Sequence, residues 1–285
     1  MNKKLNLKVM LKNPMIQVII VYLLWLRVGI IDEGKLYGFV TGILKIRSRI
    51  LLTYILNADN LYYIFHFIAV TILACNIFFE HSFEEMGLKK ENINKEVKAL
   101  LRFVVIFIGG FSVVSQLISG YMLTTSYIIV VAITQFCFVA LVEESTFRGF
   151  ICYNLFESAK NKKMLYFMFV LSAVLFAFMH LPPFLGSVEN VTFIKIVNRL
   201  FNPFIMGIWF AIMYYYKRNL YICMIWHGAY NLIFSFVFGK LQSICYMAFI
   251  IISIIYLMKT IEEETVKEDK VWYNKFTIYL KYMNI

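Results

Sequence analysis

The longest stretch of the sequence without a charged residue, from Phe103 to Val142, limits what this chain can fold into more than any other feature. A helix needs about 20 predominantly apolar residues to cross the ~30 Å hydrocarbon core of a bilayer, so this stretch is long enough for two crossings. The chain as a whole is 61% hydrophobic and 16% charged, whereas an ordinary soluble domain carries about 25% charge. The sequence therefore predicts an all-α polytopic membrane protein.

Apolar runs of about 20 residues predict about eight transmembrane helices in the whole chain. The Phe103–Val142 run supplies two of them, separated by a turn at Gly120–Ser126. The segment Asp32–Asp59 is interrupted by lysine and arginine, which favours an interfacial helix over a ninth crossing. The other predicted spans lie near Met15–Ile31, Asn60–Phe79, Met164–Leu181, Leu200–Tyr216, Leu220–Phe238 and Leu241–Met258.

Lysine and arginine outnumber aspartate and glutamate by 28 to 17. The basic residues stand in short clusters between apolar runs, without a nucleic-acid-binding motif, so they indicate topology and contacts with anionic lipid. If the N-terminus is cytoplasmic, the cytoplasmic segments carry 19 of the basic residues and the opposite segments carry 7. The sequence therefore predicts a multi-pass protein of the cell membrane with both termini cytoplasmic and no nucleic-acid partner.

Three charged residues, Glu143, Glu144 and Arg148, interrupt the apolar sequence "FVALVEESTFRGF". An ionisable group in hydrocarbon costs about 2.5–3.5 kcal/mol, so each needs a partner or a polar cavity. Glu144 and Arg148 are four residues apart and can pair on one helix face. Glu143 points about 100° away and is left without a local partner. Alternatively, "EESTFR" ends the span at the membrane surface, but the charge-free residues 149–156 favour a continuing helix.

Histidines on two other predicted spans can meet these charges. His180 closes "FAFMHLPP", and an antiparallel hairpin turning near Lys160 would bring it within ~5 Å of the depth of Glu143. We therefore expect His180 to be the partner of Glu143, although an interfacial histidine is the alternative. His227 and Asn231 are four residues apart in "MIWHGAYNLIF" and share a face, either in a site or as a polar contact between helices.

Together, these residues form three ordered patterns that resemble the signature motifs of the CPBP family of intramembrane proteases. This family includes the type II CAAX prenyl endopeptidases and the bacterial Abi proteins associated with bacteriocin processing and immunity. The resemblance covers about Ser126 to Phe238. The three patterns are Glu143-Glu144-x-x-x-Arg148, Phe176-x-x-x-His180 and His227-x-x-x-Asn231.

The resemblance implies motif-bearing helices that enclose an intramembrane catalytic cavity, and peptide-bond hydrolysis within it. Glu143 would activate water together with His180, while His227 and Asn231 would donate to the oxyanion of the tetrahedral intermediate. The remaining motif residues would support these groups, namely Glu144, Arg148 and Phe176.

Members of the family are also described as metalloproteases. If this chain is metal-dependent, the ligands of a Zn²⁺ ion would be Glu143, His180 and His227. The sequence lacks the HExxH motif and draws these ligands from three separate helices. We therefore favour catalysis by the glutamate without a cofactor, and keep zinc as the alternative.

The expected partners are the lipid bilayer and a peptide or protein substrate in or at the membrane, with bacteriocin maturation or self-immunity as the biological role. A catalytically silent membrane binding, regulatory or immunity protein with the same fold is the main alternative. A proton-coupled transporter is less favoured, since the sequence shows no inverted repeat.

The sequence also predicts three regions. Residues 1–125 form an N-terminal membrane region with about three transmembrane helices and an interfacial segment. Residues 126–240 form the catalytic core, and residues 241–285 form the last transmembrane helix and a cytoplasmic or interfacial tail.

Overall fold

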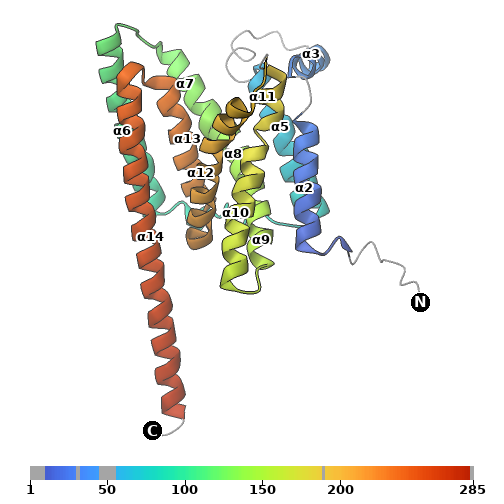
Figure 1. Ribbon diagram of the computed structural model, residues 1–285, viewed down its shortest axis with the longest axis vertical. Coiled ribbons are helices and arrows are strands. Elements are labelled where there is room, and N and C mark those ends of the chain that lie inside the picture. The colour runs from blue at the N-terminus through green and yellow to red at the C-terminus, as the bar shows by residue number, and fades with distance from the viewer. Residues whose placement is uncertain (1–9, 30–32, 45–55, 188–189, 283–285) are drawn as a thin grey trace, which may run out of the picture.

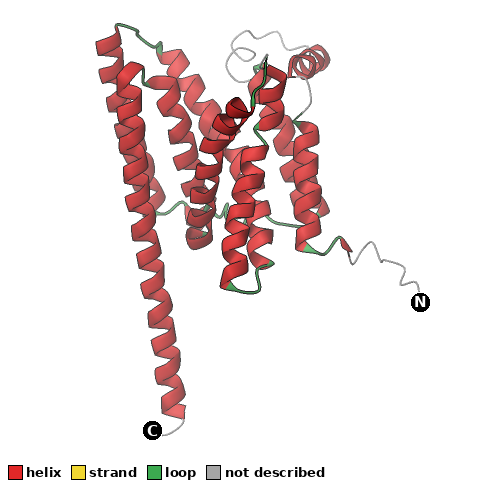
Figure 2. Cartoon of the chain, viewed as in Figure 1, coloured by secondary structure: helices red, strands yellow, loops and turns green. Residues whose placement is uncertain are grey.

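The computed structural model describes residues 10–29, 33–44, 56–187 and 190–282, and these contain helices and no strand (Figure 1, Figure 2). The predicted all-α fold is confirmed. The α-helices are α2 (Pro14–Val28), α3 (Glu33–Leu44), α5 (Ala58–His66), α6 (Lys95–Ser119), α7 (Thr125–Ile133), α8 (Leu141–Glu144), α9 (Tyr153–Glu157), α10 (Lys162–Phe178), α11 (Leu181–Ser187), α12 (Phe193–Lys217), α13 (Leu220–Phe236) and α14 (Gly239–Tyr282). The π-helical segments are η1 (Phe67–Phe78), η3 (Thr134–Ala140) and η4 (Ser145–Cys152), and η2 (Lys90–Asn92) is a 3₁₀ turn.

Within the described residues, six helical segments are long and apolar enough to cross a membrane. Two shorter apolar helices, α2 and α13, lie where the sequence predicts the first and seventh spans. Each predicted span therefore coincides with an apolar helix, although two of them are shorter than 18 residues. The six longer segments are Ala58–Phe78, Lys95–Ser119, Thr125–Glu157, Lys162–Leu185, Phe193–Lys217 and Gly239–Glu263.

Most of these helices begin at a residue that suits an N-cap. The side-chain oxygen of the cap accepts a hydrogen bond from a backbone N–H of the first turn, which otherwise has no partner within the helix. The caps are Asn13, Asn57, Asn94, Thr124, Asn161, Thr192 and Asn219.

The motif glutamates lie inside a continuous helical segment that runs from Thr125 to Glu157 through α7, η3, α8, η4 and α9. The interpretation in which "EESTFR" ends the span is therefore wrong, because the helix continues well beyond Arg148. Glu143 and Glu144 occupy the short α-helical turn α8, between two π-helical segments. π-Helical turns are uncommon and often occur at functional sites.

The helices form a bundle whose two ends differ (Figure 1). The start of α2, the end of α14 and the α9–α10 turn lie at one end, and α3 and α11 lie at the other. The helix α3 lies across the direction of the bundle, as expected of an interfacial segment, whereas residues 45–55 of that segment fall outside the described residues. The predicted tail continues α14 as one helix past its neighbours.

Helices α10 and α12 pack closely because Gly207 of α12 faces Ala173 of α10. A Cβ atom at Gly207 would lie 2.9 Å from the Ala173 Cα atom. Likewise, Gly228 of α13 faces the ring of Phe136 in η3, as expected from the small residues beside His227. These two contacts fix the helices that carry the motif histidines against their neighbours.

Candidate active site

A cavity of about 650 Å³ lies between α5, the η3–α8 segment, α10, α12 and α13. The four predicted catalytic residues, Glu143, His180, His227 and Asn231, all line it, together with Phe176. The sequence spacing therefore identified the correct faces of three separate helices.

Glu144 and Arg148 form the ion pair that their spacing predicts, with 3.1 Å between Glu144 Oε1 and Arg148 Nη1. Both side chains are almost completely buried. The Arg148 guanidinium also lies 4.0 Å from the centre of the Phe176 ring, which gives it a cation–π contact. Phe176 thus supports the site by covering the arginine, and the buried charge of Arg148 has both an anionic and an aromatic partner.

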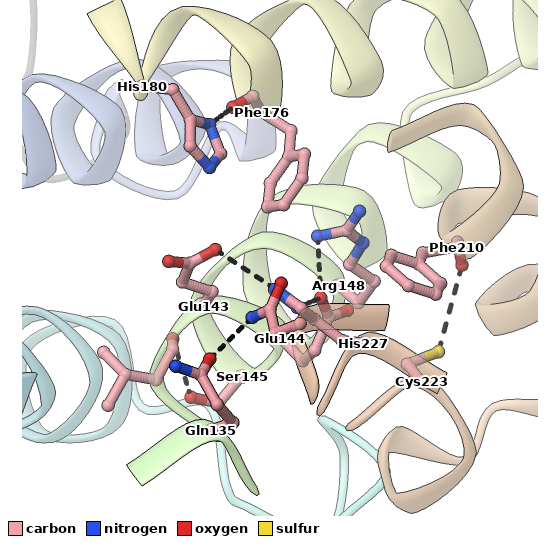
Figure 3. Close-up of polar contacts among 12 residues, drawn as sticks. Gln135, Glu143, Glu144, Ser145, Arg148, Phe176, His180, Phe210, Cys223 and His227 are labelled. Carbon is pink, nitrogen blue, oxygen red and sulfur yellow. Dashed lines mark hydrogen bonds and ion pairs between the residues drawn. The ribbon is translucent and has the colours of Figure 1, made fainter. Parts of the chain in front are cut away.

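His227 is held between the two motif glutamates (Figure 3). Its Nδ1 lies 2.7 Å from Glu144 Oε1, and its Nε2 lies 3.8 Å from Glu143 Oε2. Because a carboxylate only accepts hydrogen bonds, Nδ1 is the nitrogen that carries the proton toward Glu144. Glu144 therefore positions His227 as well as Arg148, which the spacing within one helix did not predict.

The predicted direct pairing of Glu143 with His180 is wrong. No hydrogen bond or ion pair joins them among the described residues, and the histidine within ion-pair distance of Glu143 is His227. His180 instead places its Nδ1 2.9 Å from the Phe176 carbonyl oxygen, to which it donates. Its Nε2 is thereby left as the acceptor nitrogen. Figure 3 shows His180 and Glu143 on opposite sides of the same space, so a bound water or substrate can lie between them.

The helix α10 ends at Phe178, just before His180, and the short helix α11 begins at Leu181. Pro182 and Pro183 lie in the first turn of α11, where a missing N–H costs no helical hydrogen bond. The prolines therefore begin a new helix beyond the break, and His180 lies at the break, as predicted.

The Asn231 side chain donates from Nδ2 to Gln135 Oε1 at 2.8 Å. An asparagine amide has two N–H donors, so this bond fixes the amide and leaves one donor for a ligand. Gln135 was not predicted as a site residue. Its signal was present, because it is a polar residue inside the charge-free run between Phe103 and Val142.

Residues outside the three motifs also line the cavity. The Tyr63 hydroxyl on α5 is a hydrogen-bonding partner of the Glu143 carboxylate. Asp59 of α5 and Arg199 of α12 line the cavity as well. Sequence spacing gave no reason to assign them to a site, because α5 and the start of α12 contain no motif.

The described residues do not group three histidine, cysteine, aspartate or glutamate side chains in the manner of a metal site. Of the three proposed zinc ligands, His227 is engaged by both glutamates and His180 is separated from Glu143. The arrangement of these side chains therefore does not fit a three-ligand zinc site, and no catalytic step is derived through a metal.

The family model of the type II CAAX prenyl endopeptidase Rce1-like proteins matches residues 125–233. This confirms the resemblance to CPBP membrane proteases for the segment that carries all three motifs. No curated protein and no solved structure matches the chain. The Rce1-like region supplies Gln135 and all the motif residues, whereas Tyr63 and Asp59 come from the preceding part of the chain.

Proposed function

We propose that the chain is an intramembrane endopeptidase that hydrolyses peptide bonds of a membrane-associated peptide or protein. The observation that carries this proposal is the environment of Glu143. Its carboxylate is 5% exposed, its Oε2 has no hydrogen-bond partner among the described residues, and it faces a cavity shared with His180, His227 and Asn231. Burying a carboxylate in a membrane costs free energy, and ionisable residues within membrane spans are commonly functional.

In the proposed reaction a water molecule lies between Glu143 and His180. Glu143 accepts a proton from the water, and the water oxygen forms a bond to the carbonyl carbon of the scissile peptide. His180 Nε2 accepts a hydrogen bond from the second O–H of the water and orients it, because its Nδ1–H is engaged by the Phe176 carbonyl oxygen. The carbon–nitrogen bond then breaks as the proton on Glu143 passes to the leaving amine.

The carbonyl oxygen becomes negatively charged in this step and needs donors. Asn231 offers the amide N–H that Gln135 does not use. His227 donates from Nε2 only when both of its ring nitrogens carry protons, and in that form it has a carboxylate on each side. Such donors act on the charge that develops in the transition state, where each is worth about 10²–10³ in rate.

The proposed location is the cell membrane, with both termini in the cytoplasm, because 19 basic residues lie in the segments on that side and 7 on the other. Maturation of a bacteriocin-like peptide, or immunity against one, is the proposed role. The name of the matched family also offers a peptide with a prenylated cysteine near its C-terminus as a candidate substrate.

The test is peptide cleavage by the purified protein in detergent, with hydrophobic fluorogenic peptides that carry or lack a prenylated cysteine. Glu143→Gln removes the base while keeping its shape, and we expect the rate to fall about 10²–10⁴-fold. Glu157→Gln is the matched control, because Glu157 is an exposed glutamate at the end of the same helical segment. Its rate should equal that of the unaltered chain.

A chelator added in parallel separates the glutamate mechanism from the zinc alternative. Cleavage that survives the chelator and is lost in Glu143→Gln supports the glutamate mechanism. Loss with the chelator favours zinc, and cleavage retained by Glu143→Gln contradicts the assigned base. If none of the peptides is cleaved while the protein remains folded, a silent binding or immunity protein becomes the better interpretation.

A further inference from the structure

The side chains that line the cavity become more exposed toward one end of the bundle. Along α12, Met206 and Phe210 are buried, whereas Asn198, Arg199 and Asn202 near the start of the helix are exposed. The helix therefore leads from an apolar, buried part of the cavity to a polar rim. Helices α13 and α5 line the same cavity, so their side-chain exposure shows whether the cavity opens in one direction.

Helices α13 and α5 show the same gradient toward the same end. Along α13, His227 is buried, Asn231 is half-buried and Phe234 is 45% exposed. Along α5, Tyr63 is half-buried and Asp59, in the first turn, is exposed. Because α13 runs antiparallel to α5 and α12, exposure that rises toward its end and toward their starts marks one opening. This opening lies at the end of the bundle that carries α3 and α11 (Figure 1).

The other end of the motif helix is closed by packed side chains. After Glu144, the residues Phe150, Ile151 and Leu155 each have no exposed surface, and Arg148 is 1% exposed. Tyr214 of α12, also without exposed surface, donates to the Met86 carbonyl oxygen at 3.1 Å below them. The described residues therefore leave no polar passage from Glu143 to the end of the bundle that carries the start of α2 and the end of α14.

The closed end is also the basic end. Lys160, Lys162 and Lys163 lie at the α9–α10 turn, and Lys217 and Arg218 lie where α12 meets α13. Clusters of this kind, in short segments next to membrane spans, face the cytoplasm. Among the described residues the open end carries fewer basic residues, so the distribution of charge and the direction of the opening point to opposite sides of the membrane.

We propose that the cavity opens on the extracytoplasmic side of the membrane, and that the substrate is a peptide presented from that side. The peptide chemistry rests on the proposed function, whereas the position of the entrance does not. The rim suits a polar peptide, since Arg199 and Asp59 form no ion pair with a described residue and lie on different walls. A tail that remained in the cytoplasm would meet only the closed, apolar end.

The experiment measures which side reaches the cavity, by cysteine labelling in intact cells that express the full chain. Cys137 is the exposed cysteine among the described residues, so all variants carry Cys137→Ala. Asn198→Cys places a thiol at the rim, outside the proposed catalytic groups. Glu157→Cys places one at the opposite end without removing a basic residue. We expect a membrane-impermeant maleimide to label Asn198→Cys in intact cells, and Glu157→Cys only after permeabilisation.

Cleavage gives a second measurement. A fluorogenic peptide added outside intact cells should be cleaved, and a bulky impermeant thiol reagent should block that cleavage in Asn198→Cys but not in Glu157→Cys. The reversed labelling pattern, or cleavage that appears only after permeabilisation, overturns the proposal. If no peptide is cleaved in any condition, the proposed peptidase function fails, and labelling of Asn198→Cys from outside would still establish the entrance.

Discussion

The closed and open ends of the site satisfy their polar groups in different ways. At the closed end, Glu144 is paired with both Arg148 and His227, and Phe176 covers the arginine. At the open end, Glu143 and His180 face each other without a direct bond. The opposite charges of Glu144 and Arg148 hold the fold together, whereas Glu143 Oε2 has no hydrogen-bond partner among the described residues and is available to a ligand. Substitutions at the two ends should therefore fail in different ways.

The largest expected effect is on stability, at the closed end. Arg148→Met leaves Glu144 buried without its cation, and breaking a buried pair in this way costs about 3–5 kcal/mol. Thermal unfolding of the protein in detergent measures the loss. Arg218→Met is the matched control, because Arg218 is 39% exposed and pairs with Glu157 at 3.6 Å, a surface interaction worth under about 1 kcal/mol. Equal losses of stability in the two variants would contradict the distinction between a buried and a surface ion pair.

Asn231→Ala should instead reduce activity and leave stability nearly unchanged. Loss of one oxyanion donor lowers the turnover rate about 10²–10³-fold, and Asn231 is only half-buried. Steady-state cleavage and thermal unfolding are measured on the same sample. Ser235→Ala, one turn further along α13, serves as the control, since its hydroxyl bonds only the Asn231 carbonyl oxygen. A fall in stability that accounts for the lost activity would remove Asn231 from the proposed chemistry.

Gly228→Ala tests the contact that brings α13 to the motif helix. The added Cβ atom would lie 2.4 Å from the Phe136 ring, and overpacking of this kind costs about 1–3 kcal/mol. Gly109→Ala in α6 is the control, because nothing lies within 4 Å of its added Cβ atom and alanine favours a helix. Combining Gly228→Ala with Phe136→Leu should recover part of the stability. If Gly228→Ala has the same thermal stability as the unaltered protein, the close contact between Gly228 and Phe136 is contradicted.

The smallest effect is expected at Gln135, which only orients Asn231. Gln135→Ala removes one hydrogen bond, worth about 0.5–1.5 kcal/mol, so turnover should fall about 2–12-fold with little change in KM. Thr134→Val, the neighbouring cavity residue, controls for the change in the lining. An effect as large as that of Asn231→Ala would mean that Gln135 contacts the reacting groups itself.

The sequence predicted the parts of this site that depend on one helix. The spacing of Glu144 and Arg148 predicted an ion pair, and the structure confirms it. The contact of His227 with Glu144 joins different helices, and helical periodicity does not say which faces of two helices meet. The expected pairing of Glu143 with His180 rested on similar depth alone, which fixes the position along the membrane normal and not the distance across the bundle.

The π-helical segments on both sides of Glu143 and Glu144 make the number of residues in this helix important for the site. Their hydrogen bonds span one residue more than those of an α-helix, so each segment accommodates a residue that an α-helix of the same path would omit. Deleting one residue from Thr134–Ala140 would remove that extra residue and let an α-helix follow the same path, so side chains within the segment would change their positions around the helix. In this helix the spacing between residues is part of the active site.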